Sequence, residues 1–275
     1  ILRCLVGSEM CIRDRYYPEG FVVPFTQIVH DRAVVEVLRG CIRGCRFCQA
    51  GFIYRPFREK SIDTIKNETK SLCEQTGYEE VSLSSLSTSD YTEINKLLEN
   101  LVEYTDGEQI NLSLPSLRID NFSEELLEKI KSVRKSGLTF APEAGTQRLR
   151  DVINKNITEE EIMRTCRTAF EGGYSTVKLY FMLGLPEETL EDVEGIAKLA
   201  QKVLDLYYET PKEKRGKSVQ ISVSTATFVP KPFTPFEFEP QATPEEIKEK
   251  QEHLFKSLTS RKIRPVSYTH LRAHE

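Results

Sequence analysis

The chain has 275 residues, of which 39% are hydrophobic and 29% are charged, and its formal net charge is −4. This composition is typical of a globular domain large enough to bury a core, and the negative balance excludes a uniformly basic nucleic-acid-binding surface. No apolar run reaches the roughly 18 to 20 residues of a membrane-spanning helix, and no secretory signal is recognisable. We therefore expect a cytoplasmic protein without a membrane partner.

The two ends differ from the rest of the chain. Residues 1–15 and 266–275 show no sustained periodicity, and both stretches resemble translated sequencing-adapter sequence. We expect an artefactual leader at 1–15, an artefactual tail at 266–275, and one domain over 16–265. The alternative is that both ends are native and supply metal ligands, namely Cys4, Cys11, His270 and His274.

Between these ends, apolar strands alternate with amphipathic helices, which is the pattern of parallel α/β folds. Six strands rich in Val, Ile, Leu, Thr or Phe are predicted, at Ala33–Leu38, Val81–Ser85, Ile110–Leu114, Leu138–Ala141, Thr176–Leu183 and Val219–Ala226. Right-handed connections between six such units form an open barrel. The sequence thus predicts an α/β fold, a partial (β/α)6 TIM-like barrel, with its chemistry at the carboxyl ends of the strands.

Several helices are marked at their starts by a capping side chain with an acid three residues later. The pairs are Asp90 with Glu93, Thr158 with Glu161, and Thr243 with Glu246; in the last, Pro244 occupies the first helical position. Apolar stripes at helical spacing are predicted at Ile94, Leu97, Leu98 and Leu101, and at Leu126, Leu127, Ile130 and Val133. Helix ends are predicted at Gly137 and at Gly172–Gly173.

Three cysteines follow the first predicted strand directly, in the spacing Cys-x₃-Cys-x₂-Cys. Cys41, Cys45 and Cys48 can each bind one iron of a [4Fe–4S] cube, which leaves one iron without a protein ligand. Cys73 and Cys166 fall within predicted helices, where a buried thiol acting as a small hydrophobe is expected. Basic residues near the motif could face an anionic substrate or offset the charge of the cluster: Arg39, Arg43, Arg46, Arg55, Arg58 and Lys60.

The cysteines also have plainer interpretations. A structural zinc site needs a fourth cysteine or histidine, and residues 16–265 offer only His30 and His253. A disulfide with one free thiol is disfavoured in a reducing compartment. Gly40 and Gly44 suit a tight loop around a cluster.

The motif resembles the signature of the radical S-adenosylmethionine (SAM) superfamily, in which an aromatic residue, here Phe47, precedes the last cysteine. The resemblance covers nearly all of 16–265 and continues at the ends of successive predicted strands, in the segments 40–51, 54–56, 140–146, 178–186 and 228–232. These motifs are similar to those of the cobalamin-binding-type branch of the superfamily, and to an uncharacterised group within it.

The resemblance implies an enzyme that uses a [4Fe–4S] cluster to cleave SAM reductively to methionine and a 5′-deoxyadenosyl radical. It also implies an electron donor such as flavodoxin or ferredoxin, an unknown substrate, and possible use of cobalamin through a domain absent from this chain. One alternative is a methylthiotransferase-like modifier of RNA or protein, although the acidic balance argues against RNA. A second alternative is a non-catalytic iron–sulfur redox module.

The resemblance further implies positions for residues around SAM. Phe47 is expected against the adenine, Glu143 at the ribose or the amino group, Lys155 near the methionine carboxylate, and Gly184 in the loop behind the adenine. Each residue also has a purely structural interpretation: Phe47 as a core aromatic, Glu143 as a surface acid on a turn, Lys155 as a solvated helix end, and Gly184 as part of the barrel core.

The second predicted strand departs from the pattern of the superfamily. It ends in Ser84-Ser85-Leu86-Ser87-Thr88 rather than in the Gly-Gly-Glu that holds the methionine amine in many members. The hydroxyl of Ser85 or Ser87 could replace that contact, or the amine could be held elsewhere.

Overall fold

The computed structural model describes residues 18–267, apart from residues 19, 27, 114–137 and 217. Contacts divide the chain into two compact units. The first contains Ile1–Ile42 and Tyr54–Leu117, and the second contains Arg43–Ile53 and Lys135–Glu275, so far as these ranges are described. Within the same ranges, none of the helices combines the length and the hydropathy needed to span a bilayer.

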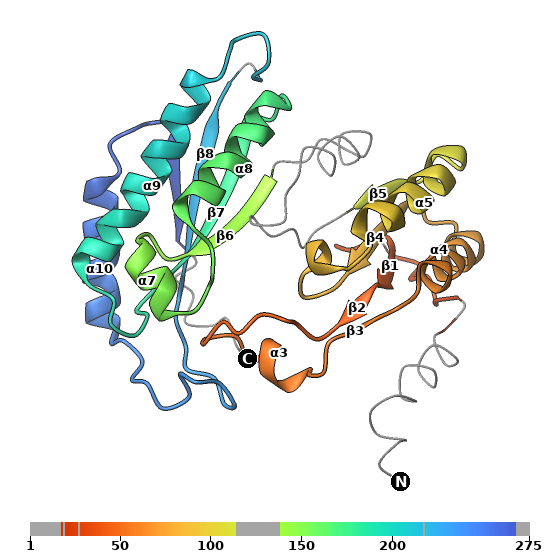
Figure 1. Cartoon of the computed structure of the whole chain (residues 1–275), viewed down its shortest axis with the longest axis horizontal. Coiled ribbons are helices and arrows are strands. Elements are labelled where there is room, and N and C mark those ends of the chain that lie inside the picture. Colours follow the sequence, from red (N-terminus) through yellow and green to blue (C-terminus); the bar gives the residue numbers. More distant parts are fainter. Residues whose placement is uncertain (1–17, 19, 27, 114–137, 217, 268–275) are drawn as a thin grey trace. The chain divides into compact units, whose positions relative to one another are not determined.

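The first unit contains a three-stranded parallel sheet in the order β1-β4-β5 (Figure 1). Its strands are β1 (Ala33–Glu36), β4 (Glu80–Ser84) and β5 (Asn111–Ser113). A separate antiparallel pair joins β2 (Leu38–Arg39) to β3 (Arg58–Glu59). The single strand predicted at Ala33–Leu38 is therefore divided, and the chain leaves the parallel sheet just before the first cysteine.

The structure describes two α-helices in the first unit. α4 (Ile62–Thr76) begins after Ser61, whose hydroxyl accepts a hydrogen bond from the Thr64 N–H at 3.2 Å. α5 (Ile94–Gly107) buries the predicted stripe at Leu97, Leu98 and Leu101.

The capping box predicted for α5 at Asp90 and Glu93 is wrong. Asp90 closes a short 3₁₀ helix, η1 (Thr88–Asp90), and Glu93 precedes α5 without a side-chain capping bond. Because the extended residue Tyr91 separates the two helices, Asp90 ends one turn rather than starting the next.

The second unit contains a four-stranded parallel sheet in the order β6-β7-β8-β9. Its strands are β6 (Leu138–Glu143), β7 (Thr176–Leu183), β8 (Gln220–Thr227) and β9 (Ile263–Ser267). The bounds of β7 are those predicted, whereas β9 was not predicted. β9 lies at the edge of the sheet, where Pro265 is tolerated because only one side of the strand is paired.

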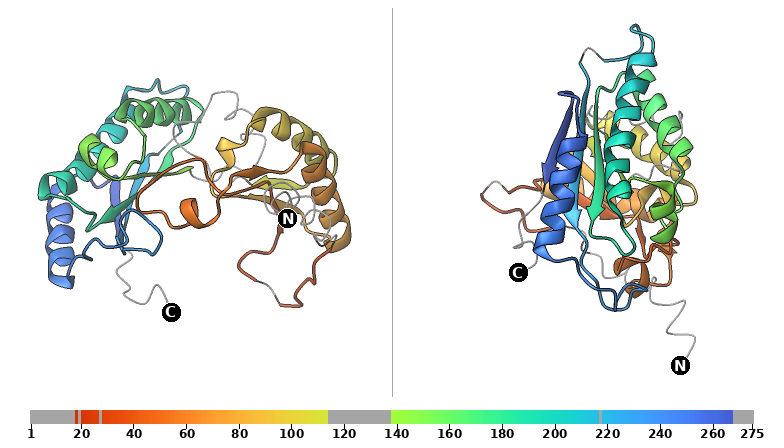
Figure 2. Two further views of the ribbon diagram at one scale, coloured as in Figure 1. Left: turned by 60° about the horizontal axis from the view of Figure 1, so that its bottom comes forward. Right: turned by 90° about the vertical axis from the view of Figure 1, so that its left-hand side faces the viewer.

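Helices α8 (Glu159–Glu171), α9 (Leu190–Glu209) and α10 (Pro244–Ser257) lie along one face of this sheet (Figure 2). Alternate residues of β7 are buried, as expected for a strand with one covered face: Val177, Leu179, Phe181 and Leu183. The capping boxes predicted at Thr158 and Thr243 are confirmed, and α8 ends at the predicted glycine pair. The predicted stripe at Leu126–Val133 and the helix end at Gly137 lie outside the described residues.

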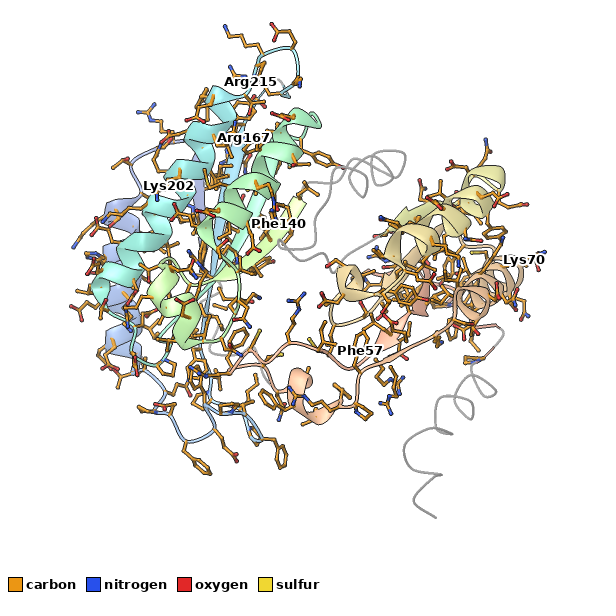
Figure 3. All side chains as sticks on the ribbon, viewed as in Figure 1. Phe57, Lys70, Phe140, Arg167, Lys202 and Arg215 are labelled. Atoms are coloured by element: carbon orange, nitrogen blue, oxygen red, sulfur yellow. The ribbon has the colours of Figure 1, made fainter. Side chains whose placement is uncertain are left out.

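Ion pairs join α8 and α9 on their exposed sides, and Figure 3 labels the basic member of each pair, Arg167 on α8 and Lys202 on α9. Arg167 lies 3.5 Å from Glu209, and Lys202 pairs with Glu159. Exposed pairs of this kind contribute roughly 0–1 kcal/mol each, so the buried apolar side chains, such as Phe140 on β6, supply most of the stability.

Candidate functional site

The three cysteines of the motif lie on the loop that follows β2. Cys45 is buried, whereas Cys41 and Cys48 are half-buried, and none of the three is in a disulfide. The Cys48 N–H donates to the Cys45 carbonyl at 3.1 Å, which closes a turn, and the short helix α3 (Ala50–Ile53) follows. These three thiols are soft ligands within eight residues, and this donor set suits an iron–sulfur cluster.

The loop begins at a position that only glycine can occupy. Gly40 has a φ of +86°, and a Cβ there would lie 2.6 Å from the Tyr54 carbonyl oxygen and 2.9 Å from the Pro56 carbonyl oxygen. A side chain would therefore displace the backbone just before Cys41.

The later part of the loop is held against the segment between α7 (Gln147–Val152) and α8. The Arg46 N–H donates to the Ile153 carbonyl at 3.0 Å, and the Asn154 amide donates to the Gly44 carbonyl at 2.8 Å. Arg46 also donates through its guanidinium to the Val152 carbonyl at 2.5 Å. These bonds connect residues more than 100 positions apart, and they fix the cysteine loop beside the end of β6.

Three of the predicted SAM-site residues come together at this point. Lys155 donates to a carboxylate oxygen of Glu143 at 3.0 Å, and its ammonium lies 5.9 Å from the centre of the Phe47 ring. The side chains of Lys155 and Glu143 are only 10% and 16% exposed, so Lys155 is not a solvated helix end and Glu143 is not a surface acid. Phe47 also packs against a hydrophobic cluster that includes Leu149 and Phe228.

Glu143 has a φ of +70°, in the left-handed region that L-residues rarely adopt. It follows an irregularity in the pairing of β6 with β7, which turns the end of the strand. The next turn is held by Arg150, a fully buried guanidinium that donates to the carbonyls of Ala144, Gly145 and Ile157 at 3.0–3.2 Å. Burial lowers the pKa of Arg150 from its ordinary value, but these acceptors stabilise the charged guanidinium.

Asp192 fixes the same turn from α9. Its carboxylate accepts hydrogen bonds from the Thr146 hydroxyl, the Arg148 guanidinium and the Thr189 N–H. Burial by itself raises the pKa of this carboxyl, but the hydrogen bonds outweigh it and the pKa falls below its ordinary value. Gly145 packs so closely on α9 that a Cβ would lie 2.2 Å from the Ile196 nitrogen.

Arg150 and Asp192 were missed by the sequence reasoning. Asp192 has a recognisable local signal, since Thr189 and Asp192 form a capping box with aspartate in place of glutamate. Its bond to Thr146, 46 residues away, has no local signal.

Gly184 ends β7 with a φ of +80°. Its N–H donates to a carboxylate oxygen of Glu188 at 2.7 Å, and a Cβ would lie 2.9 Å from a methyl group of Ile247 and 3.0 Å from the Cβ of Ala242. The close approach that glycine permits here is therefore to the segment around the start of α10. The position of Gly184 behind the adenine of SAM stays a prediction.

Ser85 follows β4 in the first unit. Its hydroxyl hydrogen-bonds the Thr88 hydroxyl at 2.8 Å, and it is half-buried. The neighbouring Ser87 hydroxyl is buried and makes no hydrogen bond to any described residue. The contact of Ser85 or Ser87 to the methionine amine stays a prediction.

The two remaining described cysteines behave as predicted. Cys73 in α4 and Cys166 in α8 are buried, and burial raises their pKa values to about 11 and about 12. Both thiols therefore stay protonated, unlike a metal-bound thiolate. In the described part of the chain, no three His, Cys, Asp or Glu side chains are gathered around a single-ion site.

Comparison with known proteins decides the family. The profile of the radical SAM superfamily matches residues 35–200, which include the cysteine motif, β6 and β7. The chain belongs to the radical SAM superfamily. It is therefore an enzyme of a family that uses a [4Fe–4S] cluster and SAM, as its motif predicted.

Individual relatives agree with this assignment. An uncharacterised protein of Methanocaldococcus jannaschii is 36% identical over 206 residues, which cover 75% of this chain and 42% of that protein. An uncharacterised methyltransferase of Pyrococcus horikoshii is 27% identical over 197 residues, covering 71% of this chain and 40% of that protein. Other relatives carry the name of methylthiotransferases. The chain thus spans about two fifths of the length of its first relatives.

The fold has a solved counterpart. The radical SAM methyltransferase TsrM of Kitasatospora setae, whose structure contains cobalamin and a [4Fe–4S] cluster, matches with a TM-score of 0.58 at 16% identity. The match covers 76% of this chain and 39% of TsrM. At this identity the likeness concerns the fold, and it confirms the predicted α/β barrel type.

Proposed function

We propose that this chain is the core of an enzyme that generates a 5′-deoxyadenosyl radical, with Cys41, Cys45 and Cys48 as the ligands of its cluster. When bound, the cluster supplies the electron that cleaves the C5′–S bond of SAM and releases methionine. The observation that carries the proposal is the cysteine loop itself: its Gly44 carbonyl accepts from Asn154, and its Phe47 ring lies near Lys155, the partner of Glu143.

The protein side chains would bind and orient SAM. Glu143 keeps acceptor capacity beyond the one bond from Lys155, so it can accept from a ribose hydroxyl or from an amino group. Lys155 carries a positively charged ammonium, which can bind a carboxylate. The Phe47 ring offers an apolar face beside them. Gly184 and Ser85 complete the proposed set of SAM contacts.

We propose that the reaction that follows also needs parts of the enzyme outside the matched segment, because that segment covers only 42% and 40% of the first relatives. We propose hydrogen abstraction from an unidentified substrate, with cobalamin-linked methyl transfer as its form in the full-length protein. The match to TsrM supports the fold that this proposal requires. The same proposal includes an electron donor such as flavodoxin or ferredoxin. It also includes a reducing cytoplasm, which keeps the thiols reduced.

Methylthiotransferase chemistry is the second candidate, and relatives with that name support it. Such a modifier of RNA or protein usually needs a second cluster. The described cysteines outside the motif, Cys73 and Cys166, are buried in two different helices and do not form a second trio. Cobalamin-linked chemistry is therefore the preferred candidate.

The test is reductive cleavage of SAM by the full chain after anaerobic reconstitution with iron and sulfide. We expect 5′-deoxyadenosine from the wild type and from Cys166→Ala, but none from Cys45→Ala. Circular dichroism checks that both variants remain folded. An intact cluster that yields no 5′-deoxyadenosine, in this chain and in a full-length relative, would favour the redox-module alternative.

A further inference from the structure

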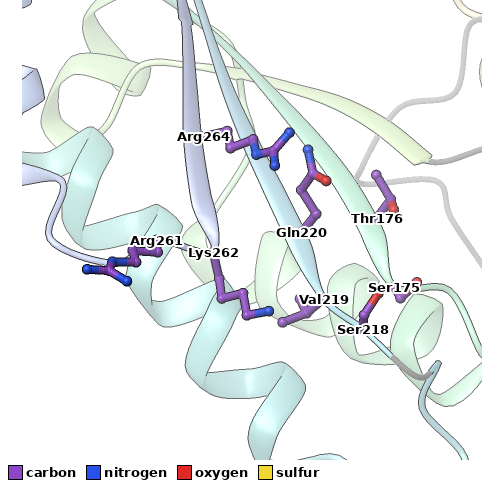
Figure 4. Close-up of a pocket in the computed structure, with 8 residues that line it drawn as sticks. All are labelled: Ser175, Thr176, Ser218, Val219, Gln220, Arg261, Lys262 and Arg264. Carbon is purple, nitrogen blue, oxygen red and sulfur yellow. The ribbon is translucent and has the colours of Figure 1, made fainter.

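A small polar cavity lies at the amino ends of β7, β8 and β9, at the opposite end of these strands from Gly184 (Figure 4). It measures about 230 Å³. Thr176 and Gln220, the first residues of β7 and β8, line it together with Ser218 and the residues around the start of β9. The radical chemistry proposed above uses none of these residues.

The charged side chains that line the cavity are all positive. Arg261, Lys262 and Arg264 line it, and no aspartate or glutamate does. None of the three side chains forms an ion pair with a residue that the structure describes. Three like charges without counter-ions repel one another, so an anion among them would relieve that repulsion. This local excess of cations is notable in a chain of net charge −4.

The side chains differ in how they face the cavity. In Figure 4 the guanidinium of Arg264 and the amide of Gln220 point toward one another, and Lys262 extends toward Val219 at the start of β8. Arg261 extends away from this group. Strand pairing holds the group in place, because Arg264 lies opposite Ser222 and Gln220 lies opposite Thr176. Arg264 and Gln220 therefore direct N–H donors toward the same place, and Lys262 adds a positive charge at the Val219 end of the cavity.

We propose that this cavity binds a phosphate or diphosphate group, either as the free anion or at the end of a small nucleotide. The planar guanidinium of an arginine matches two phosphate oxygens at once, and an amide and an ammonium can donate to the remaining oxygens. The cavity is smaller than the roughly 300–1,000 Å³ pockets that enclose a drug-sized molecule. A compact anionic group fits this volume, with the rest of a nucleotide outside the cavity.

The test is calorimetric titration of the full chain at low ionic strength with inorganic phosphate, pyrophosphate and ADP in separate arms. We expect one pyrophosphate per chain, and at least tenfold weaker binding in Arg264→Gln and in Lys262→Gln. Arg261→Gln should weaken binding less than threefold, because its side chain extends away from the others. A preference for ADP over both inorganic anions would identify the nucleotide as the source of the phosphate group.

Two controls separate a site from general attraction of anions. Lys198→Gln removes one exposed positive charge on α9, whose partner is Glu194, and should leave binding unchanged. Cys45→Ala should also bind pyrophosphate normally, so the result is independent of the cluster. Equal affinity of Arg264→Gln and wild type would overturn the proposal. So would an equal loss in Lys198→Gln, or binding of an RNA oligonucleotide without saturable binding of any of the three small anions.

Discussion

Two glutamate–lysine pairs lie near the carboxyl ends of neighbouring strands of the second unit, and they have different surroundings. Lys155 donates at 3.0 Å to Glu143, the last residue of β6, and Lys250 lies 2.8 Å from Glu188, which follows β7. The Glu143 side chain keeps 16% of its surface exposed and lies beside the cysteine loop. The Glu188 side chain is 1% exposed, and its carboxylate also accepts from the Gly184 N–H.

The comparison shows that the chemistry of a pair does not by itself reveal its role. Burial raises the pKa of Glu188, although Lys250 and the Gly184 N–H oppose the shift, and this carboxylate has little surface left for a ligand. Glu143 keeps such surface, and its strained backbone and the buried Arg150 hold it at the end of β6. We therefore propose that Glu188 serves the stability of the fold and that Glu143 serves cofactor binding.

The proposed cofactor role of Glu143 depends on a cluster bound beside it. The largest effect is therefore expected from removal of a motif cysteine. Cys45→Ala should lose nearly all reconstituted iron and sulfide, since it removes one of only three thiolate ligands. Cys166→Ala, which changes a buried thiol in α8, should bind iron as the wild type does. Iron and sulfide analysis after gel filtration measures both. Equal iron contents in the two variants would contradict the ligand assignment.

Lys250→Met should destabilise the fold, because it leaves the buried Glu188 carboxylate without its cation. Removing one partner of a buried pair costs about 3 kcal/mol of unfolding free energy. Lys198→Met is the matched control, since Lys198 is 60% exposed and should change stability by less than about 0.5 kcal/mol. Urea unfolding at pH 7 measures both. If the two variants are equally stable, the Glu188–Lys250 pair is not structural.

Glu143→Gln should weaken SAM binding about tenfold, which corresponds to about 1.4 kcal/mol, because the amide replaces a charged acceptor. Glu188→Gln should change the affinity less than about twofold, since Glu188 is enclosed. Equilibrium binding of SAM to the reconstituted variants measures the difference. The distinction between the pairs fails if Glu188→Gln has the larger effect.

The smallest effect concerns pH. Asp192 has a lowered pKa in the folded state, so its contribution is present above its unfolded pKa of about 3.9 and is lost as the pH falls through the folded value. Glu188 has a raised folded pKa, so its contribution is largest below its unfolded pKa of about 4.3 and decreases as the pH rises through the folded value. Asp192→Asn should flatten the loss of stability in acid, and Glu188→Gln should flatten the opposite slope. Urea unfolding from pH 3 to 7 provides the comparison; unchanged slopes would exclude both assignments.

The sequence predicted the local features of the fold well. The bounds of β7 and the capping boxes of α8 and α10 follow from side chains within a few residues. β9 escaped prediction because its segment contains Pro265 and overlaps the tail that was excluded as foreign. The two-residue strand β3 is too short to produce a pattern.

The candidate site was predictable only in part. The resemblance to the radical SAM superfamily pointed to Phe47, Glu143 and Lys155, which the structure brings together. The bonds that hold them, from Asn154 to Gly44 and from Thr146 to Asp192, join positions 110 and 46 residues apart. Such contacts arise from tertiary packing and have no periodic signal in a single sequence.

The most direct test of the central claim is the electron paramagnetic resonance spectrum of the reduced, reconstituted chain before and after addition of SAM. Three cysteine ligands leave one iron open, so SAM should change the spectrum of the wild type and of Cys166→Ala by binding to that iron. A spectrum that SAM leaves unchanged, from a chain with a complete [4Fe–4S] cluster, would contradict the claim that the cluster on Cys41, Cys45 and Cys48 binds SAM.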